Sequence, residues 1–153
     1  MENPTPDGDR PWLARDRRPA GATDQQVFAS GKASEALEWI ERARGRLYDF
    51  HQMMGRADLL VGEAVDELRE AGHPELADDL EAEIVGRNVI EGRWTFQIIE
   101  EYDDTYYQPA RDAVRRVEAE LMGGRRHVFE SEMKDDRRTQ GRRHHEARPE
   151  TGA

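Results

Sequence analysis

The chain has 153 residues, of which 37% are charged and 36% hydrophobic, and its net charge is −10. It has no cysteine, which excludes disulfides, thiolate catalysis and cysteine-ligated zinc or iron–sulfur sites. Its apolar runs are too short to span a membrane, and the first thirty residues lack the apolar core of a secretory signal, so we expect a single-domain cytoplasmic protein without membrane contact.

The N-terminal residues 1–32 are rich in proline and glycine and poor in apolar residues. Such a composition cannot bury enough surface to offset the entropy of ordering. We therefore expect a disordered N-terminal arm, followed by a helical domain over residues 33–122.

The first helix is predicted to begin near Ser30 to Ser34, with Ser34 as a fair N-cap, and to run to about residue 68. Apolar residues alternate at spacings of three and four from Ala36 to Leu68, which is typical of packed antiparallel helices. The stripe keeps its phase through Gly55, which favours one continuous helix, bent at most near that glycine.

A short turn, Glu70-Ala71-Gly72-His73-Pro74-Glu75, places glycine at a helix end and proline at the start of the next helix. A second helix is predicted over residues 75–107, antiparallel to the first, with Pro109 ending or kinking it. The most apolar segment, from Ile84 to Tyr102, lies in the middle of this predicted helix.

A third helix is predicted from the apolar spacing after Ala110, ended by Gly123-Gly124. Residues 123–153 are then interpreted as a short docking helix near 125–133 and a disordered basic tail. Charge separates these parts: residues 33–122 carry 22 acids and 10 bases, whereas residues 123–153 carry 6 acids and 8 bases.

The predicted hairpin brings charged residues to the level of its apolar faces, as a candidate buried polar layer: Arg44, His51, Asp58, Arg87, Asn88 and Glu91. One interpretation is a structural network that sets helix register, with Arg87 and Glu91 paired. The other is a metal site of His51, Asp58 and Glu91, whose mixed nitrogen and oxygen ligands would suit zinc, manganese or iron. An acid–base pair of Glu91 and His51 is a further alternative, although no substrate pocket is defined.

Other chemistries have little support. There is no nucleophile elbow, cysteine–histidine pair or phosphate-binding loop. The acidic domain would repel nucleic acid, and the arginines of the tail are interleaved with acids, so a nucleic-acid partner is not expected. Whether the protein is an enzyme, and with which cofactor, stays open.

The passage Gly86-Arg87-Asn88-Val89-Ile90-Glu91-Gly92-Arg93-Trp94-Thr95-Phe96-Gln97, together with Leu47 to Gln52 and Gly124 to Val128, resembles a family of small, mainly actinobacterial proteins. The resemblance covers about residues 30–145. This family is uncharacterised, so the resemblance implies no catalytic residue.

The sequence thus predicts an all-α fold, a long antiparallel hairpin with a third helix. A hairpin this thin leaves apolar surface exposed, so we expect self-association to complete a helical bundle. The favoured function is a protein-interaction or accessory protein, and the alternative is a metal-binding or metal-dependent helical protein.

Overall fold

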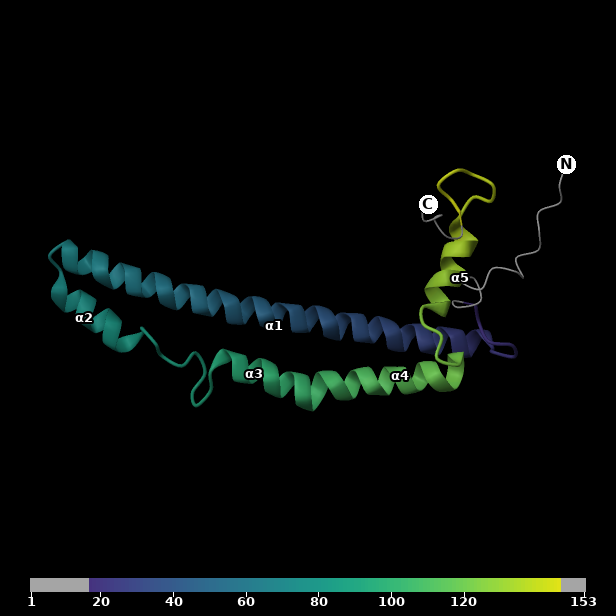
Figure 1. Ribbon diagram of the computed structural model, residues 1–153, viewed down its shortest axis with the longest axis horizontal. Helices are drawn as coiled ribbons and strands as arrows, with labels where there is room; N and C mark the ends of the chain where they lie inside the picture. The colour runs from purple at the N-terminus through teal and green to yellow at the C-terminus, as the bar shows by residue number, and fades with distance from the viewer. Residues whose placement is uncertain (1–16, 147–153) are drawn as a thin grey trace, which may run out of the picture. The chain divides into compact units, whose positions relative to one another are not determined.

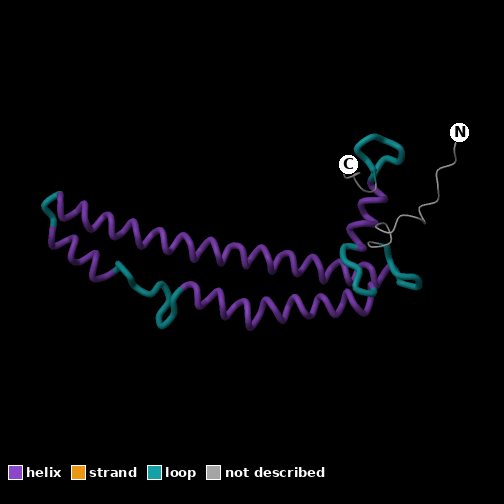
Figure 2. Tube along the Cα trace, in the orientation of Figure 1, coloured by secondary structure: helices purple, strands orange, loops and turns teal. Residues whose placement is uncertain are grey.

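The computed structural model describes residues 17–146, and every regular element within them is helical (Figure 1). Figure 2 shows helices and connecting loops in this part of the chain, and its only β pairing is an isolated bridge between Ile90 and Arg93. The predicted all-α fold is confirmed.

The chain forms two compact units. The first contains residues 17–38 and 110–146 of the described chain, and the second is Trp39–Pro109. The helices α1 and α4 contribute residues to both units.

Helix α1 (Asp24–Glu70) begins earlier than the sequence predicted. Thr23 caps it, because its Oγ1 accepts the N–H of Gln26 at 3.2 Å while the Gln26 side chain accepts the N–H of Thr23 at 2.9 Å. Residues 24–32, which the sequence placed in the arm, are therefore helical, while residues 1–16 of that arm lie outside the described chain. Ser34 is not an N-cap; its hydroxyl donates to the buried Glu118 at 3.2 Å.

The long helix continues without interruption through Gly55, as the unbroken apolar stripe predicted. It ends at Glu70, where Gly72 has φ +84° and the N–H of His73 donates to the carbonyl of Leu68 at 2.9 Å. Pro74 then opens α2 (Pro74–Glu83), so the predicted turn is confirmed. Arg69 forms ion pairs with Asp78 and Glu81 of α2.

The prediction of one helix over residues 75–107 is wrong in its central part. The chain is non-helical from Ile84 to Trp94, and helix resumes at α3 (Thr95–Tyr102). Gly86 and Gly92 adopt φ values of +72° and +76°, which a helix does not contain. A tight turn that contains Gly92 pairs Ile90 with Arg93.

After α3 the chain makes one π-helical turn, η2 (Asp103–Tyr107), and continues as α4 (Gln108–Met122). The N–H of Gln108 reaches the carbonyl of Asp103, five residues back. Pro109 follows this wide turn; of the two predicted outcomes, that it ends or kinks the helix, the first does not occur, since α4 continues through it. A wider turn accommodates proline, because proline cannot donate and its ring needs room beside the preceding turn.

In the first unit, α4 ends before Gly123, as predicted, and a short helix α5 (Val128–Arg137) follows. The core of this unit consists of Val27, Met122 and Val128. Phe129 of α5 meets Phe28 edge-on, with ring centroids 6.0 Å apart, and lies against Gly31. The part of the predicted disordered tail up to Arg137 is therefore helical, and residues 147–153 lie outside the described chain.

Candidate functional site

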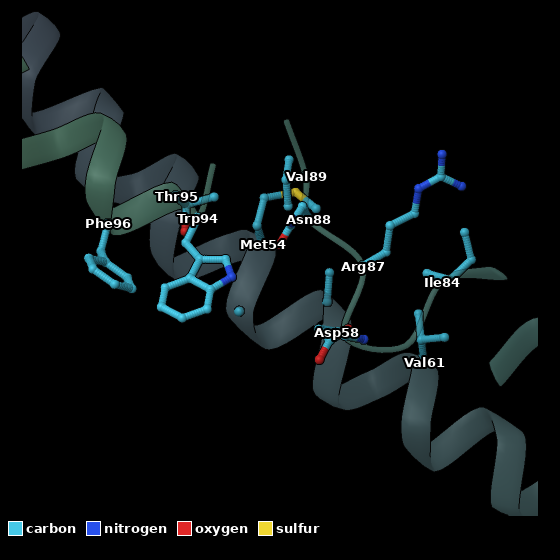
Figure 3. Close-up of a pocket in the computed structure, with 13 residues that line it drawn as sticks. Met54, Asp58, Val61, Ile84, Arg87, Asn88, Val89, Trp94, Thr95 and Phe96 are labelled. Atoms are coloured by element: carbon cyan, nitrogen blue, oxygen red, sulfur yellow. Dashed lines mark hydrogen bonds between the residues drawn. The ribbon is translucent and has the colours of Figure 1, made fainter. Parts of the chain in front are cut away.

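The second unit contains an apolar groove between α1 and the non-helical segment (Figure 3). Its volume is about 600 Å³. The larger apolar side chains that line it come from two turns of α1, from the segment and from the start of α3: Met54, Val61, Ile84, Val89, Trp94 and Phe96. We call the space lined by these six residues the apolar groove. The rings of Trp94 and Phe96 lie 5.4 Å apart, side by side, and form one aromatic wall.

Two hydrogen bonds from α1 hold the segment that forms the groove. The carboxylate of Asp58 accepts the backbone N–H of Gly86 at 2.7 Å, near one end of the segment. Nδ1 of His51 lies 2.6 Å from the hydroxyl of Thr95, just beyond its other end. The N-terminus of α3 is further stabilised because the Gln97 side chain accepts the N–H of Trp94 at 3.0 Å. The groove is thus built before any partner arrives.

The predicted buried polar layer is not formed. Arg44, His51 and Asp58 are half-buried, whereas Arg87, Asn88 and Glu91 are exposed. The three exposed residues belong to the non-helical segment, and the side chain of Arg87 points away from α1 in Figure 3. Within the described chain, no ion pair joins Arg87 to Glu91; Arg87 instead donates to the carbonyl of Glu83 at 3.4 Å.

The predicted metal site of His51, Asp58 and Glu91 also does not come together. In residues 17–146, no three His, Asp or Glu side chains are grouped so that they could hold a metal ion. His51 and Asp58 bind Thr95 and Gly86 respectively, so both serve to position the segment. The predicted site required residues 84–94 to be helical, so that Glu91 would face His51 and Asp58. These residues are not helical, and Glu91 is therefore exposed.

Arg44 pairs with a residue outside the predicted polar layer. Its guanidinium donates two hydrogen bonds to Asp103 of η2, at 2.6 and 2.8 Å, and stacks near the rings of Tyr48 and Tyr107. These hydrogen bonds hold the pKa of the Asp103 carboxyl below its usual value and raise the pKa of Arg44. Burial raises the pKa of Tyr102, whose hydroxyl donates to the carbonyl of Ile40 at 3.3 Å.

The groove lies in a strongly acidic unit. Trp39–Pro109 contains 17 Asp and Glu against 7 Arg and no Lys, a net charge of −10. Between residues 54 and 101 the acids number 13 and the arginines 4. Three of these arginines form ion pairs with acids of the same unit: Arg56 with Glu63, Arg69 with Asp78 and Glu81, and Arg93 with Glu101. The field of this unit is therefore negative, and the groove lining itself holds one acid, Asp58, and one arginine, Arg87.

Sequence reasoning missed the roles of Asp103, Thr95 and Gly86. For the segment a signal was present: two glycines and an asparagine lie among the β-branched residues Val85, Val89 and Ile90, a composition that disfavours helix. For the pairing of Arg44 with Asp103 no local signal exists, because the two residues are 59 positions apart.

Among the described residues no helix is both long and apolar enough to cross a membrane; α1 has the length but is too polar. No protein-family model, curated protein or solved structure matches this chain. The resemblance seen in the sequence therefore stays a prediction.

Proposed function

We propose that this chain is a cytoplasmic protein-interaction or accessory protein that works in association with a second copy of itself. The observation that carries the proposal is a row of exposed apolar side chains on α1. Trp39, Met53 and Leu60 stand at multiples of seven residues, with exposed fractions of 61%, 62% and 46%. We call these three residues the apolar row.

The row lies beside the face that α1 turns toward α3 and η2. At 100° per residue, the apolar row and the packed positions of α1 together cover about half of the helix circumference. The elements packed against α1 in this unit bury only part of such a wide apolar face. In Trp39–Pro109 the buried hydrophobic residues are four, Val65, Ala77, Ile99 and Tyr107, whereas thirteen large hydrophobic residues are exposed.

A second copy is the occupant that fits the row best. Residues at heptad spacing pair with the same row on another helix, and a symmetric contact removes three large side chains of each copy from water. Full burial of one such side chain contributes about 1.5–3 kcal/mol. The summed contribution is comparable with the cost of association, which is about 4–15 kcal/mol.

Sedimentation equilibrium of the full chain, with Met53→Glu and Gln52→Glu as a matched pair, tests the proposal. Both substitutions add one negative charge to adjacent positions of α1, but only Met53 belongs to the apolar row. We expect the wild type and Gln52→Glu to self-associate at about 10 µM, and Met53→Glu to be monomeric with unchanged helical circular dichroism. A wild-type protein that is fully helical and monomeric at this concentration would refute self-association.

A further inference from the structure

The apolar groove points to a second partner, distinct from another copy of the chain. We propose that it binds a basic amphipathic helix of a different protein. The groove and the apolar row consist of different residues, so a substitution can be placed in one surface without removing a side chain of the other.

The openness of the groove favours a helix over a small molecule. Its volume of about 600 Å³ lies within the range of small-ligand pockets, which is about 300–1,000 Å³. However, its lining residues stay exposed: Trp94 by 58%, Phe96 and Val89 by 41% and Ile84 by 40%. A small-ligand site buries most of its ligand, whereas a groove that is open on one side accepts one face of a helix.

The spacing of the groove residues on α1 matches the spacing of apolar side chains on an amphipathic helix. Met54 and Val61 are two turns apart on α1, about 10 Å along the helix axis. An amphipathic partner offers apolar side chains at i, i+3 or i+4, and i+7, which span the same length. Trp94 and Phe96 supply the aromatic wall against which such anchors pack.

Charge selects a basic helix. Acids outnumber arginines 13 to 4 in residues 54–101, and three of those arginines are engaged in ion pairs. The fourth, Arg87, lines the groove together with one acid, Asp58, so the negative field comes from the unit as a whole and not from the lining. Lysines or arginines on the polar face of the partner would face this negative field, whereas an acidic helix would be repelled. A second copy would bring an equally acidic unit to the groove, so it does not match the basic partner that the charge favours.

The groove is preformed, which lowers the cost of binding. Asp58 and His51 hold the segment at both ends through Gly86 and Thr95. A partner therefore does not have to order this wall, and only its own helix has to form.

The test uses two fluorescein-labelled peptides, each about five turns long, with leucines at i, i+3, i+4 and i+7 spacing. One peptide carries lysine at all other positions and the other carries glutamate. Binding to the full chain is followed by fluorescence anisotropy at about 0.1 M NaCl. We expect the lysine peptide to bind at least about tenfold more tightly than the glutamate peptide, a difference of about 1.4 kcal/mol.

Two tryptophans provide a matched pair of variants. Trp94→Ala removes the groove wall and should weaken binding of the lysine peptide by about tenfold or more. Trp39→Ala, at a tryptophan of similar exposure in the apolar row, should leave peptide binding unchanged. Phe96→Ala is the second groove variant, and circular dichroism checks that each variant keeps its helices.

Each contrary outcome overturns the proposal. If Trp94→Ala and Phe96→Ala bind as the wild type does, the peptide contacts only the acidic surface. If both peptides bind equally, charge does not select the partner. If the peptide binds only to monomeric Met53→Glu, a second copy occupies the groove. If a folded, self-associating wild type binds no peptide, the groove proposal fails and the proposed function stands.

Discussion

At the scale of single residues, Arg44 and Asp103 illustrate how a polar pair is placed inside a thin helical unit. Both side chains are mostly covered, with exposed fractions of 31% and 22%. The planar guanidinium matches the carboxylate with two hydrogen bonds and still stacks on two tyrosine rings. The pair therefore connects α1 to η2 with defined geometry.

Asp103→Asn should lower the free energy of unfolding by about 1–2 kcal/mol at pH 7, because it replaces a charge-assisted pair with a weaker contact. The Asp103 pKa is lowered in the folded state, so this stabilisation is fully present above the ordinary aspartate pKa, about 3.9. It is lost as the pH falls through the lower folded-state value. Urea unfolding between about pH 3 and pH 7 measures the difference between wild type and variant.

Asp104→Asn is the matched control, because Asp104 is adjacent and exposed. It should change the free energy of unfolding by less than about 0.5 kcal/mol at every pH. An equal effect of both substitutions, or a difference for Asp103→Asn that does not shrink at acid pH, would contradict the assigned role of the pair.

At the scale of elements, the segment from Ile84 to Trp94 decides the character of the second unit. A continuous helix there would have presented Arg87 and Glu91 to α1. As a non-helical segment it instead opens a groove lined by Ile84, Val89 and Trp94. Its shape depends on positive φ at Gly86 and Gly92 and on the contacts of both ends with α1.

Alanine substitutions distinguish this segment from a helix. Gly86→Ala and Gly92→Ala should each destabilise the protein by about 1–2 kcal/mol, since alanine is strained at these φ values. Gly62→Ala in α1, where an added methyl group meets open space, should stabilise it by about 0.5–1 kcal/mol. Thermal unfolding measures all three variants. A stabilising effect of Gly86→Ala would mean that the segment is helical.

At the scale of the whole molecule, charge and apolar surface act in opposite directions. The chain has a net charge of −10, and the acids of Trp39–Pro109 repel a second copy. The exposed apolar residues of the same unit favour association. Salt screens the electrostatic interactions and leaves the apolar contacts in place. It should therefore affect self-association and the binding of a basic helix in opposite directions.

Raising NaCl from about 0.05 to 0.5 M shortens the screening length severalfold. Self-association through the apolar row should become tighter, because repulsion between acidic units is screened. Binding of the lysine peptide should become weaker, because its attraction to the groove is screened. Sedimentation and anisotropy at each salt concentration measure the two constants. Self-association that weakens with salt would point to ion pairs, rather than the apolar row, as its basis.

The sequence by itself determined the features that depend on local spacing. The 3–4 alternation from Ala36 to Leu68 predicted the continuous α1, and glycine followed by proline predicted the turn before Pro74. Gly123-Gly124 likewise marked the end of α4. These signals suffice because helix periodicity and helix ends depend on residues only a few positions apart.

Only the tertiary structure decided what lies between the helices. The N–H of Gly86 donates to the carboxylate of Asp58, 28 residues earlier. The segment can therefore lack helical backbone hydrogen bonds at this point without leaving this N–H unpaired. Arg44 pairs with Asp103, outside the predicted layer, because η2 brings Asp103 to α1, and the predicted pair of Arg87 with Glu91 is absent because the non-helical segment leaves both residues exposed. Partners so far apart in sequence are chosen by packing, which no local pattern records.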